Sequence, residues 1–162
     1  MNVIWGSVRE PDLNEYLSQW ASFKLFGHTR GFGPCTTMGV FDGGRLVGVM
    51  VYHNLDREAG VIEISGVSDR KEWLKRHVLW EMFSYPFDQL GCQMIVMRVS
   101  ERNEQWNGRG LPRLLKAYRF TATTIPRLFG RDEAGILYAL TDDDWRANGF
   151  HRQHQVPTAC AA

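Results

Sequence analysis

Glu63 is the residue whose type and position most directly suggest chemistry. It is the one carboxylate in the apolar run 60–67, in which Glu63 and Ser65 share one face and Ile62 and Ile64 the other. A carboxylate in such a strand either forms hydrogen bonds across the sheet or acts as a base that removes a proton from a substrate. The residues alone leave both interpretations open.

Basic side chains gather a few positions further along the chain. Arg70, Lys71, Lys75 and Arg76 lie close together, with His77 next to them. Such a group either binds an anion through charge-assisted hydrogen bonds or forms a solvated basic helix face. The neighbouring acids favour the second interpretation when these residues are considered by themselves.

Other reaction classes lack their motifs. The sequence has no Gly-x-Ser-x-Gly nucleophile elbow and no Walker phosphate-binding sequence. Cys35, Cys92 and Cys160 are far apart and form no Cys-x-x-Cys pair, which predicts neither a disulfide framework nor a zinc site. His151 and His154 have metal-like spacing but no further ligands near them, so we expect no metal.

Length and composition predict one globular domain over residues 1–152, followed by a loosely ordered tail over 153–162. The chain has 162 residues, of which 44% are hydrophobic, so it can bury a substantial core. It carries 19 basic and 18 acidic residues, and this balance argues against a nucleic-acid partner. No apolar run is long enough for a membrane helix or a signal peptide, so we expect a cytoplasmic protein.

The N-terminal half reads as a helix followed by three strands. Apolar residues at helical spacing predict a helix over 12–26. Two β-rich runs, 36–41 and 46–53, flank Gly43-Gly44, which predicts a hairpin. The run 60–67 adds a third strand. Tyr52 and His53 end the second run where a substrate could approach, although a half-exposed strand histidine is the simpler interpretation of His53.

A helix and a strand follow this meander. The apolar stripe predicts a long amphipathic helix over 71–90, kinked near its end by Pro86 and stopped by Gly91. The run 93–100 is apolar except for Arg98, which predicts a strand covered on both faces. Strand, helix and strand in this order form a βαβ unit with parallel neighbours.

The remaining elements close the domain. We expect a polar loop that contains Asn103, then a short helix with Pro112 near its start. Two further strands are predicted over 120–128 and 135–140. Thr141 precedes three aspartates and is placed to cap a final helix.

This order of elements is that of the GNAT acyl-CoA N-acyltransferases, and the centre of the chain resembles that superfamily in its residues. Residues 84–91 (SYPFDQLG) and 94–103 (MIVMRVSERN) are similar to the ribosomal-protein-acetylating branch, and residues 114–120 (LLKAYRF) are similar to its last helix. The resemblance covers roughly residues 36–142. It implies an α/β fold with a mixed, mostly antiparallel central sheet, a central βαβ unit and flanking helices.

The phosphate-binding sequence departs from the family pattern. GNAT proteins usually carry Gln/Arg-x-x-Gly-x-Gly/Ala at the start of the long helix, where bare amides hold the CoA pyrophosphate. Here that position reads Arg70-Lys-Glu-Trp73-Leu-Lys75, so Trp73 and Lys75 replace small residues. The tyrosine that commonly serves as general acid would fall near Leu115 and is missing at that position.

The resemblance implies that an acetyl group moves from acetyl-CoA to a primary amine. Glu63 would be the general base and Tyr118 would protonate the leaving thiolate, although Glu63 could instead be structural and Tyr118 could simply pack. Side-chain cations would replace part of the lost amide contacts, and Trp73 is expected to pack beneath the loop rather than along the cofactor. Asn103 would bind pantetheine or cap a turn. The implied acetyl-CoA-binding residues are Ser65, Val67, Arg70, Trp73, Leu74, Lys75, Arg76 and Asn103.

Two rival functions stay open. One is a GNAT domain that binds acyl-CoA or a protein partner without turnover. The other is a nucleic-acid-modifying enzyme of the kind found among phage proteins, which the balanced charge disfavours. The acceptor, a small molecule or a protein amine, is not identified, and a homodimer is left open. The family architecture also predicts that the parallel strand pair opens beside residues 65–67 and frees backbone amides there.

Overall fold

The computed structural model of the chain describes residues 1–106 and 111–148. In these residues the strands are β1 (Asn2–Gly6), β2 (Cys35–Asp42), β3 (Arg45–Asp56), β4 (Val61–Ser68), β5 (Met94–Ser100), β6 (Thr121–Gly130) and β7 (Glu133–Thr141). The helices are α1 (Pro11–Phe26), α2 (Arg76–Ser84), α3 (Glu101–Trp106), α4 (Leu111–Ala117) and α5 (Asp142–Ala147), and a π-helical turn (Tyr85–Gln89) follows α2. No helix in the described ranges is long and apolar enough to cross a membrane.

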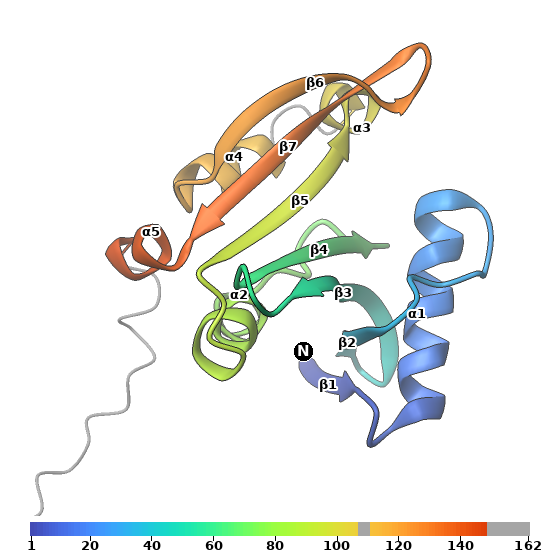
Figure 1. Ribbon diagram of the computed structural model, residues 1–162. Coiled ribbons are helices and arrows are strands. Elements are labelled where there is room, and N and C mark those ends of the chain that lie inside the picture. Colours follow the sequence, from blue (N-terminus) through green and yellow to red (C-terminus); the bar gives the residue numbers. More distant parts are fainter. Residues whose placement is uncertain (107–110, 149–162) are drawn as a thin grey trace, which may run out of the picture.

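The strands form one mixed sheet in the order β1-β2-β3-β4-β5-β7-β6 (Figure 1). Only β4 and β5 pair in parallel; the other neighbours are antiparallel. Parallel strands need a crossover connection, and α2 supplies it, so the expected βαβ unit is present.

The parallel pair is open over most of its length. Three residue pairs align, and the last of them sets Glu63 opposite Val96. Beyond Glu63, β4 goes on pairing with β3, whereas β5 goes on pairing with β7. Figure 1 shows the two strands diverging at this point. The predicted opening beside residues 65–67 is therefore confirmed, and among the described strands that edge of β4 has no ladder partner.

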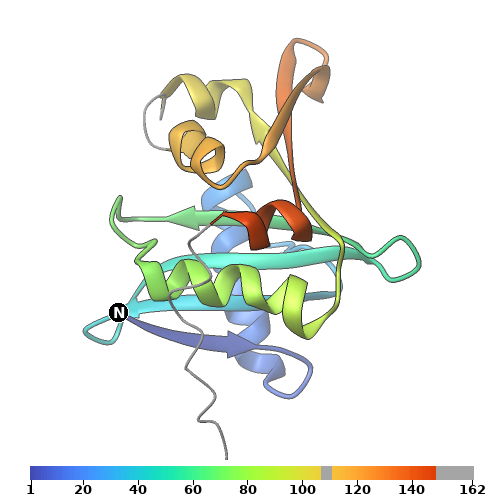
Figure 2. The ribbon, with the colours of Figure 1, turned by 90° about the vertical axis from the view of Figure 1, so that its left-hand side faces the viewer.

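Helices cover both faces of the sheet. Figure 2 shows α2, α4 and α5 on the near face, with α1 behind the sheet. On the α1 side, Leu17 and Ala21 pack against Val49 and Val51 of β3. The larger cluster lies on the α2 side, where α4 contributes Leu115. The sheet therefore has an α1 face, covered by α1, and an α2 face, covered by α2, α4 and α5.

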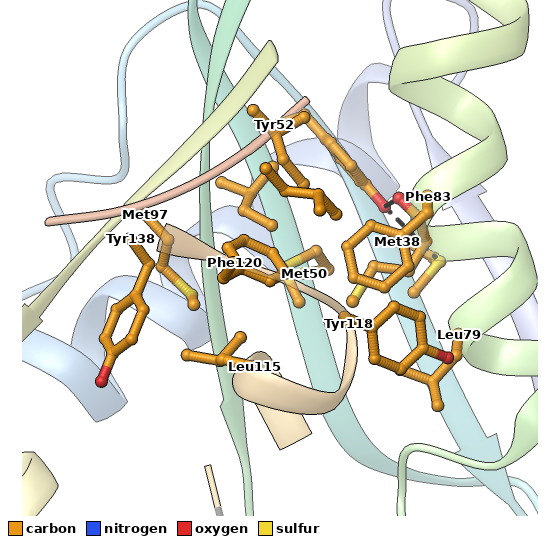
Figure 3. Close-up of a cluster of buried hydrophobic side chains, with 14 of the residues drawn as sticks. Met38, Met50, Tyr52, Leu79, Phe83, Met97, Leu115, Tyr118, Phe120 and Tyr138 are labelled. Carbon is orange, nitrogen blue, oxygen red and sulfur yellow. Dashed lines mark hydrogen bonds between the residues drawn. The ribbon is translucent and has the colours of Figure 1, made fainter. Parts of the chain in front are cut away.

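Aromatic rings and methionines fill the α2 face (Figure 3). The Phe83 ring lies 5.0 Å from the Tyr118 ring and 6.1 Å from the Phe120 ring. Met50 and Met97 extend into the same layer from β3 and β5. Because thioether side chains adapt to irregular gaps, they suit a layer that must cross the opened strand pair.

The first helix after β4 begins later than expected. A helix is predicted from residue 71, but α2 begins at Arg76, and residues 69–75 are irregular. The side chain of Trp73 lies over β3, where a Cβ added to Gly48 would come within 2.4 Å of Trp73 Cε3. The bare glycine makes room for the indole, which is buried there. Packing of Trp73 thus holds this segment against the sheet.

The end of α2 shows how the chain accommodates Pro86. Proline has no N–H, so Pro86 cannot donate to the carbonyl of Met82 four residues earlier. The Tyr52 hydroxyl donates to that carbonyl instead, at 2.9 Å, from the α2 face of β3. The helix continues as a π turn in which the Leu90 amide donates to the carbonyl of Tyr85. The disturbance expected at Pro86 is therefore a π turn at the end of the helix.

Three further expectations have different outcomes. The strand β5 is not covered on both faces, because burial alternates along it and Arg98 is exposed. The expected loop around Asn103 is instead the helix α3. Thr141 does cap α5, where its side chain accepts from the Asp144 amide at 3.1 Å. The predicted tail over 153–162 lies outside the described residues.

Candidate active site

Buried polar side chains meet on the α1 face where β4 leaves β5. Glu63 is 9% exposed, and both of its carboxylate oxygens accept hydrogen bonds. Arg98 Nε donates to Oε1 at 2.6 Å, and Asn54 Nδ2 donates to Oε2 at 2.9 Å. The charge that burial would penalise is thereby compensated by a guanidinium and an amide.

The positions of these partners follow from the backbone. Arg98 lies two residues beyond Val96, the last residue of β5 that aligns with β4, so its guanidinium reaches back across the start of the gap. Asn54 has φ of 51° and lies at the irregularity that follows His53 in β3. Asparagine tolerates this left-handed conformation, which aims its amide at Glu63.

His53 forms a second polar contact in the same group. It is 5% exposed and lies opposite Glu63 in the β3–β4 register. Its Nε2 is 2.9 Å from Ser65 Oγ, on the first residue of that face beyond the aligned stretch. The Phe32 ring lies 5.0 Å away from the imidazole. The interpretation of His53 as a half-exposed strand residue is therefore wrong, because β2 and β4 flank its strand and Phe32 lies against its ring.

The environment of His53 favours its neutral form. Burial lowers the pKa of the imidazole below its usual value, and the positive charge of Arg98 acts in the same direction. The negative charge of Glu63 opposes this shift but does not overcome it. A neutral imidazole at neutral pH is able to accept a proton.

A hollow of about 320 Å³ lies on the α1 side of the sheet. It is formed by α1, the two residues that follow β1 and residues 30–35, and its lining includes Glu15, Arg30, Phe32 and Cys35. Phe32 also contacts His53, and Cys35 lies opposite His53 in the β2–β3 register. The hollow therefore approaches the polar group from the α1 face.

The predicted cofactor residues divide between the two faces. Ser65 and Val67 point to the α1 face, where Val67 packs against the α1 cluster. Trp73 and Leu74 pack with the core of the α2 face. Packing of Trp73 was the favoured expectation for this residue, and its burial agrees with it. Asn103 lies exposed on α3.

The predicted cations also differ in their surroundings. Arg70 is ion-paired with Asp42, the last residue of β2. Lys75 and Arg76 are exposed and stand at the start of α2, where Lys75 is the N-cap residue. Lys75 has no ion-pair partner among the described residues. The first amides of a helix lack partners within the helix, so this end of α2 combines amide donors with positive charge.

Tyr118 lies on the opposite side of the sheet from Glu63. It follows α4, is 3% exposed and packs on Phe83, near the end of α2 (Figure 3). Burial raises the pKa of its phenol to about 12, and the nearby Arg76 opposes the shift. The phenol therefore stays protonated near neutral pH and can act as a hydrogen-bond donor.

Two partners in this group were not selected from the sequence as site residues. Arg98 was noted only as the polar exception in its strand, and Asn54 was not singled out. The predicted strand meander could have pointed to Asn54 and His53. Strands joined by a short turn place residues near the turn opposite one another, so these two residues were to be expected near Glu63. The partnership of Arg98 with Glu63 depends on the parallel register, which the sequence does not encode locally.

Comparison with known proteins defines the class of fold around this site. No family model matches the sequence, and no curated protein matches it. Solved structures do match: with a chimera of the Vibrio cholerae spermidine N-acetyltransferase SpeG and hSSAT, the TM-score is 0.63 at 11% identity, covering 90% of this chain and 99% of that chain. The chain has the fold of the GNAT acetyltransferases, and the predicted fold class is confirmed.

Two further structures agree with this assignment. A GCN5-related N-acetyltransferase from Brucella melitensis has a TM-score of 0.62 at 17% identity, covering 93% of this chain and 79% of that chain. The ribosomal-protein-S5-alanine acetyltransferase from Vibrio fischeri has a TM-score of 0.56 at 19% identity and covers 68% of this chain. The match spans 63% of that protein, which is less than two thirds of its length.

Proposed function

We propose that the chain is an N-acyltransferase that moves an acetyl group from acetyl-CoA to a primary amine. The observation that carries the proposal is the coincidence of two features. The opened edge of β4 and the buried polar group of Glu63, Ser65 and His53 meet at the same point of the sheet. In a GNAT fold, an opened parallel pair gives a thioester access to backbone amides.

The two faces of the sheet suit the two substrates. On the α2 face, Lys75, Arg76 and the first amides of α2 would hold the CoA phosphates, in place of the glycine amides of the family. Arg70 would contribute after leaving Asp42. Free amides along the edge of β4 would stabilise the oxyanion that forms on the thioester carbonyl. Most of the rate would come from holding thioester and amine together.

The acceptor would approach from the α1 face. The hollow lined by Phe32 and Cys35 lies on that side of the sheet, and Glu15 offers it a carboxylate that suits a cationic amine. The resemblance to the family predicts a proton acceptor on this face and points to Glu63 for that role, which the next subsection reconsiders. Tyr118, on the other face, would donate a hydrogen bond to the leaving sulfur. The assignment of both roles rests on position.

The function is tested with acetyl-CoA and a panel of amines. Calorimetry measures acetyl-CoA binding, and release of the CoA thiol reports turnover with each amine. Spermidine and a peptide with an N-terminal alanine belong in the panel, because structures of the same fold carry those names. We expect binding and thiol release with at least one amine, and mass spectrometry should show the acetylated product.

Other outcomes point to the rival functions. Binding of acetyl-CoA without thiol release on any amine would support a binding domain without turnover. The presence of Trp73 and Lys75 where the family has small residues favours this rival. Salt-sensitive binding of duplex DNA would instead favour a nucleic-acid substrate. A cytoplasmic location stays a prediction, and a homodimer stays open.

A further inference from the structure

The amine that attacks the thioester must lose a proton, and the two carboxylate oxygens of Glu63 are both engaged. Oε1 accepts from Arg98 and Oε2 accepts from Asn54. Protonation would remove the negative charge that pairs with Arg98, inside a site where Glu63 is 9% exposed. Both hydrogen bonds to the carboxylate would be weakened, because they would no longer be charge-assisted.

We infer that the proton passes through the Ser65 hydroxyl to His53, and that Glu63 and Arg98 hold this pair in place. The inference rests on the proposed function and assigns its proton acceptor. Ser65 Oγ lies 2.9 Å from His53 Nε2, which is within the distance for direct proton transfer. Ser65 is also the first residue of this face that borders the open edge of β4.

The step balances without any further reactant. The amine nitrogen bonds to the thioester carbon, and its proton moves to Ser65 Oγ as the Ser65 proton moves to His53 Nε2. The carbon–sulfur bond then breaks and the CoA thiolate leaves. The imidazolium returns its proton through solvent to the thiolate, which restores neutral His53. This direction requires the tautomer of His53 that carries its hydrogen on Nδ1.

The surroundings of His53 match this role. The charged groups that face it are Glu63 from β4 and Arg98 from β5, which pair with each other. From β2 it faces the thiol of Cys35, and from the segment before β2 it faces the Phe32 ring. Burial and Arg98 lower the pKa of His53, so the imidazole is neutral above about pH 6.5, its ordinary pKa.

The pH dependence of the parent relative to His53→Gln tests the inference. The variant keeps an amide that can bond to Ser65 but accepts no proton. The readout is kcat/KM with acetyl-CoA and the best amine of the panel, between pH 5 and 8. The ionisation of the amine cancels in the ratio of parent to variant. We expect a ratio of about 100 above pH 6.5, since general base catalysis contributes at least that factor.

The ratio should fall toward one as the pH drops through the lowered pKa of His53, because the protonated imidazole accepts no further proton. Ser65→Ala should lose activity to a similar extent, and Ser65→Thr should recover most of it by restoring the hydroxyl. Calorimetry should show that His53→Gln binds acetyl-CoA as tightly as the parent does. Glu63→Gln keeps the size of the side chain but can accept only one of the two hydrogen bonds. Because the charge of Glu63 raises the pKa of His53, the loss of activity at low pH should persist in this variant and move to lower pH.

Several results would overturn the inference. One is a ratio of kcat/KM between the parent and His53→Gln that stays near one at every pH. Another is a fall of kcat/KM at low pH that disappears in Glu63→Gln but persists in His53→Gln. NMR titration of the resting protein gives a readout without turnover, and an imidazole pKa above 6.5 for His53 would also overturn it. An active parent with these results leaves the proposed function standing, whereas a parent inactive on every amine removes both.

Discussion

At the scale of single residues, the site is defined by which charges are already paired. Glu63 forms an ion pair with Arg98, and Asp42 forms one with Arg70. Lys75 has no ion-pair partner in the described part of the chain. A paired cation must break its ion pair before it can bind a phosphate. The cations predicted from the sequence should therefore contribute unequally to acetyl-CoA binding.

We expect Lys75→Ala to weaken acetyl-CoA binding about tenfold, because a hydrogen bond to a charged group is worth roughly 1.5–3 kcal/mol. Arg70→Ala is the matched control and should have a smaller effect, since Arg70 is already paired with Asp42. Calorimetry over a series of salt concentrations measures both. The difference between parent and Lys75→Ala should shrink as salt screens the exposed charge. Equal losses in the two variants would contradict the unequal roles.

At the scale of elements, α2 and the segment before it are held to the sheet by contacts with β3. The indole of Trp73 lies over Gly48, and the Tyr52 hydroxyl replaces the donor that Pro86 lacks. These two contacts fix the two ends of the segment that would carry the CoA phosphates. Packing at the sheet and geometry at the start of α2 are therefore coupled.

Tyr52→Phe should lower the free energy of unfolding by about 1–3 kcal/mol, because it leaves the buried Met82 carbonyl without the donor that replaces the missing Pro86 amide. Chemical denaturation measures the loss. Tyr16→Phe is a control with the same change on an exposed side chain of α1, and it should leave stability within about 0.5 kcal/mol of the parent. A Tyr52→Phe variant as stable as the parent would show that the Met82 carbonyl has another donor.

Gly48→Ala should displace the segment before α2, because the new Cβ would lie 2.4 Å from the Trp73 ring. We expect a loss of about 1–3 kcal/mol in stability from overpacking, together with weaker acetyl-CoA binding. Trp73→Leu in the Gly48→Ala background should recover part of the stability by removing the clash. A double-mutant cycle followed by denaturation gives the coupling energy. Simple additivity of the two changes would mean that Trp73 does not rest on Gly48.

At the scale of the whole molecule, the gap divides one continuous sheet into two pairing groups. β1 to β4 pair on one side of it and β5 to β7 on the other, and the three aligned pairs that end at Glu63 join them. The core of the α2 face spans both groups. A ligand that occupies the gap would therefore contact both parts of the sheet.

Acetyl-CoA at saturating concentration should slow hydrogen exchange of the amides in residues 64–78, which cover the free edge of β4 and the start of α2. The edge strand β1 is the internal control and should change little, because it lies four strands away from β5 in the sheet order. The melting temperature should rise with ligand concentration by mass action. Protection confined to α3 and α4 would place the ligand elsewhere.

The order of the elements from α1 to β5, the hairpin, the α5 cap and the isolated carboxylate of Glu63 could be derived from the sequence, because each depends on the period of side chains or on a few adjacent residues. The strand β1 and the helix α3 were not predicted. The start of α2, the partnership of Arg98 with Glu63 and the burial of His53 could not be derived from the sequence. They depend on which strands lie side by side and on which glycine leaves room for an indole. Such contacts join residues far apart in the chain, and only the assembled sheet brings them together.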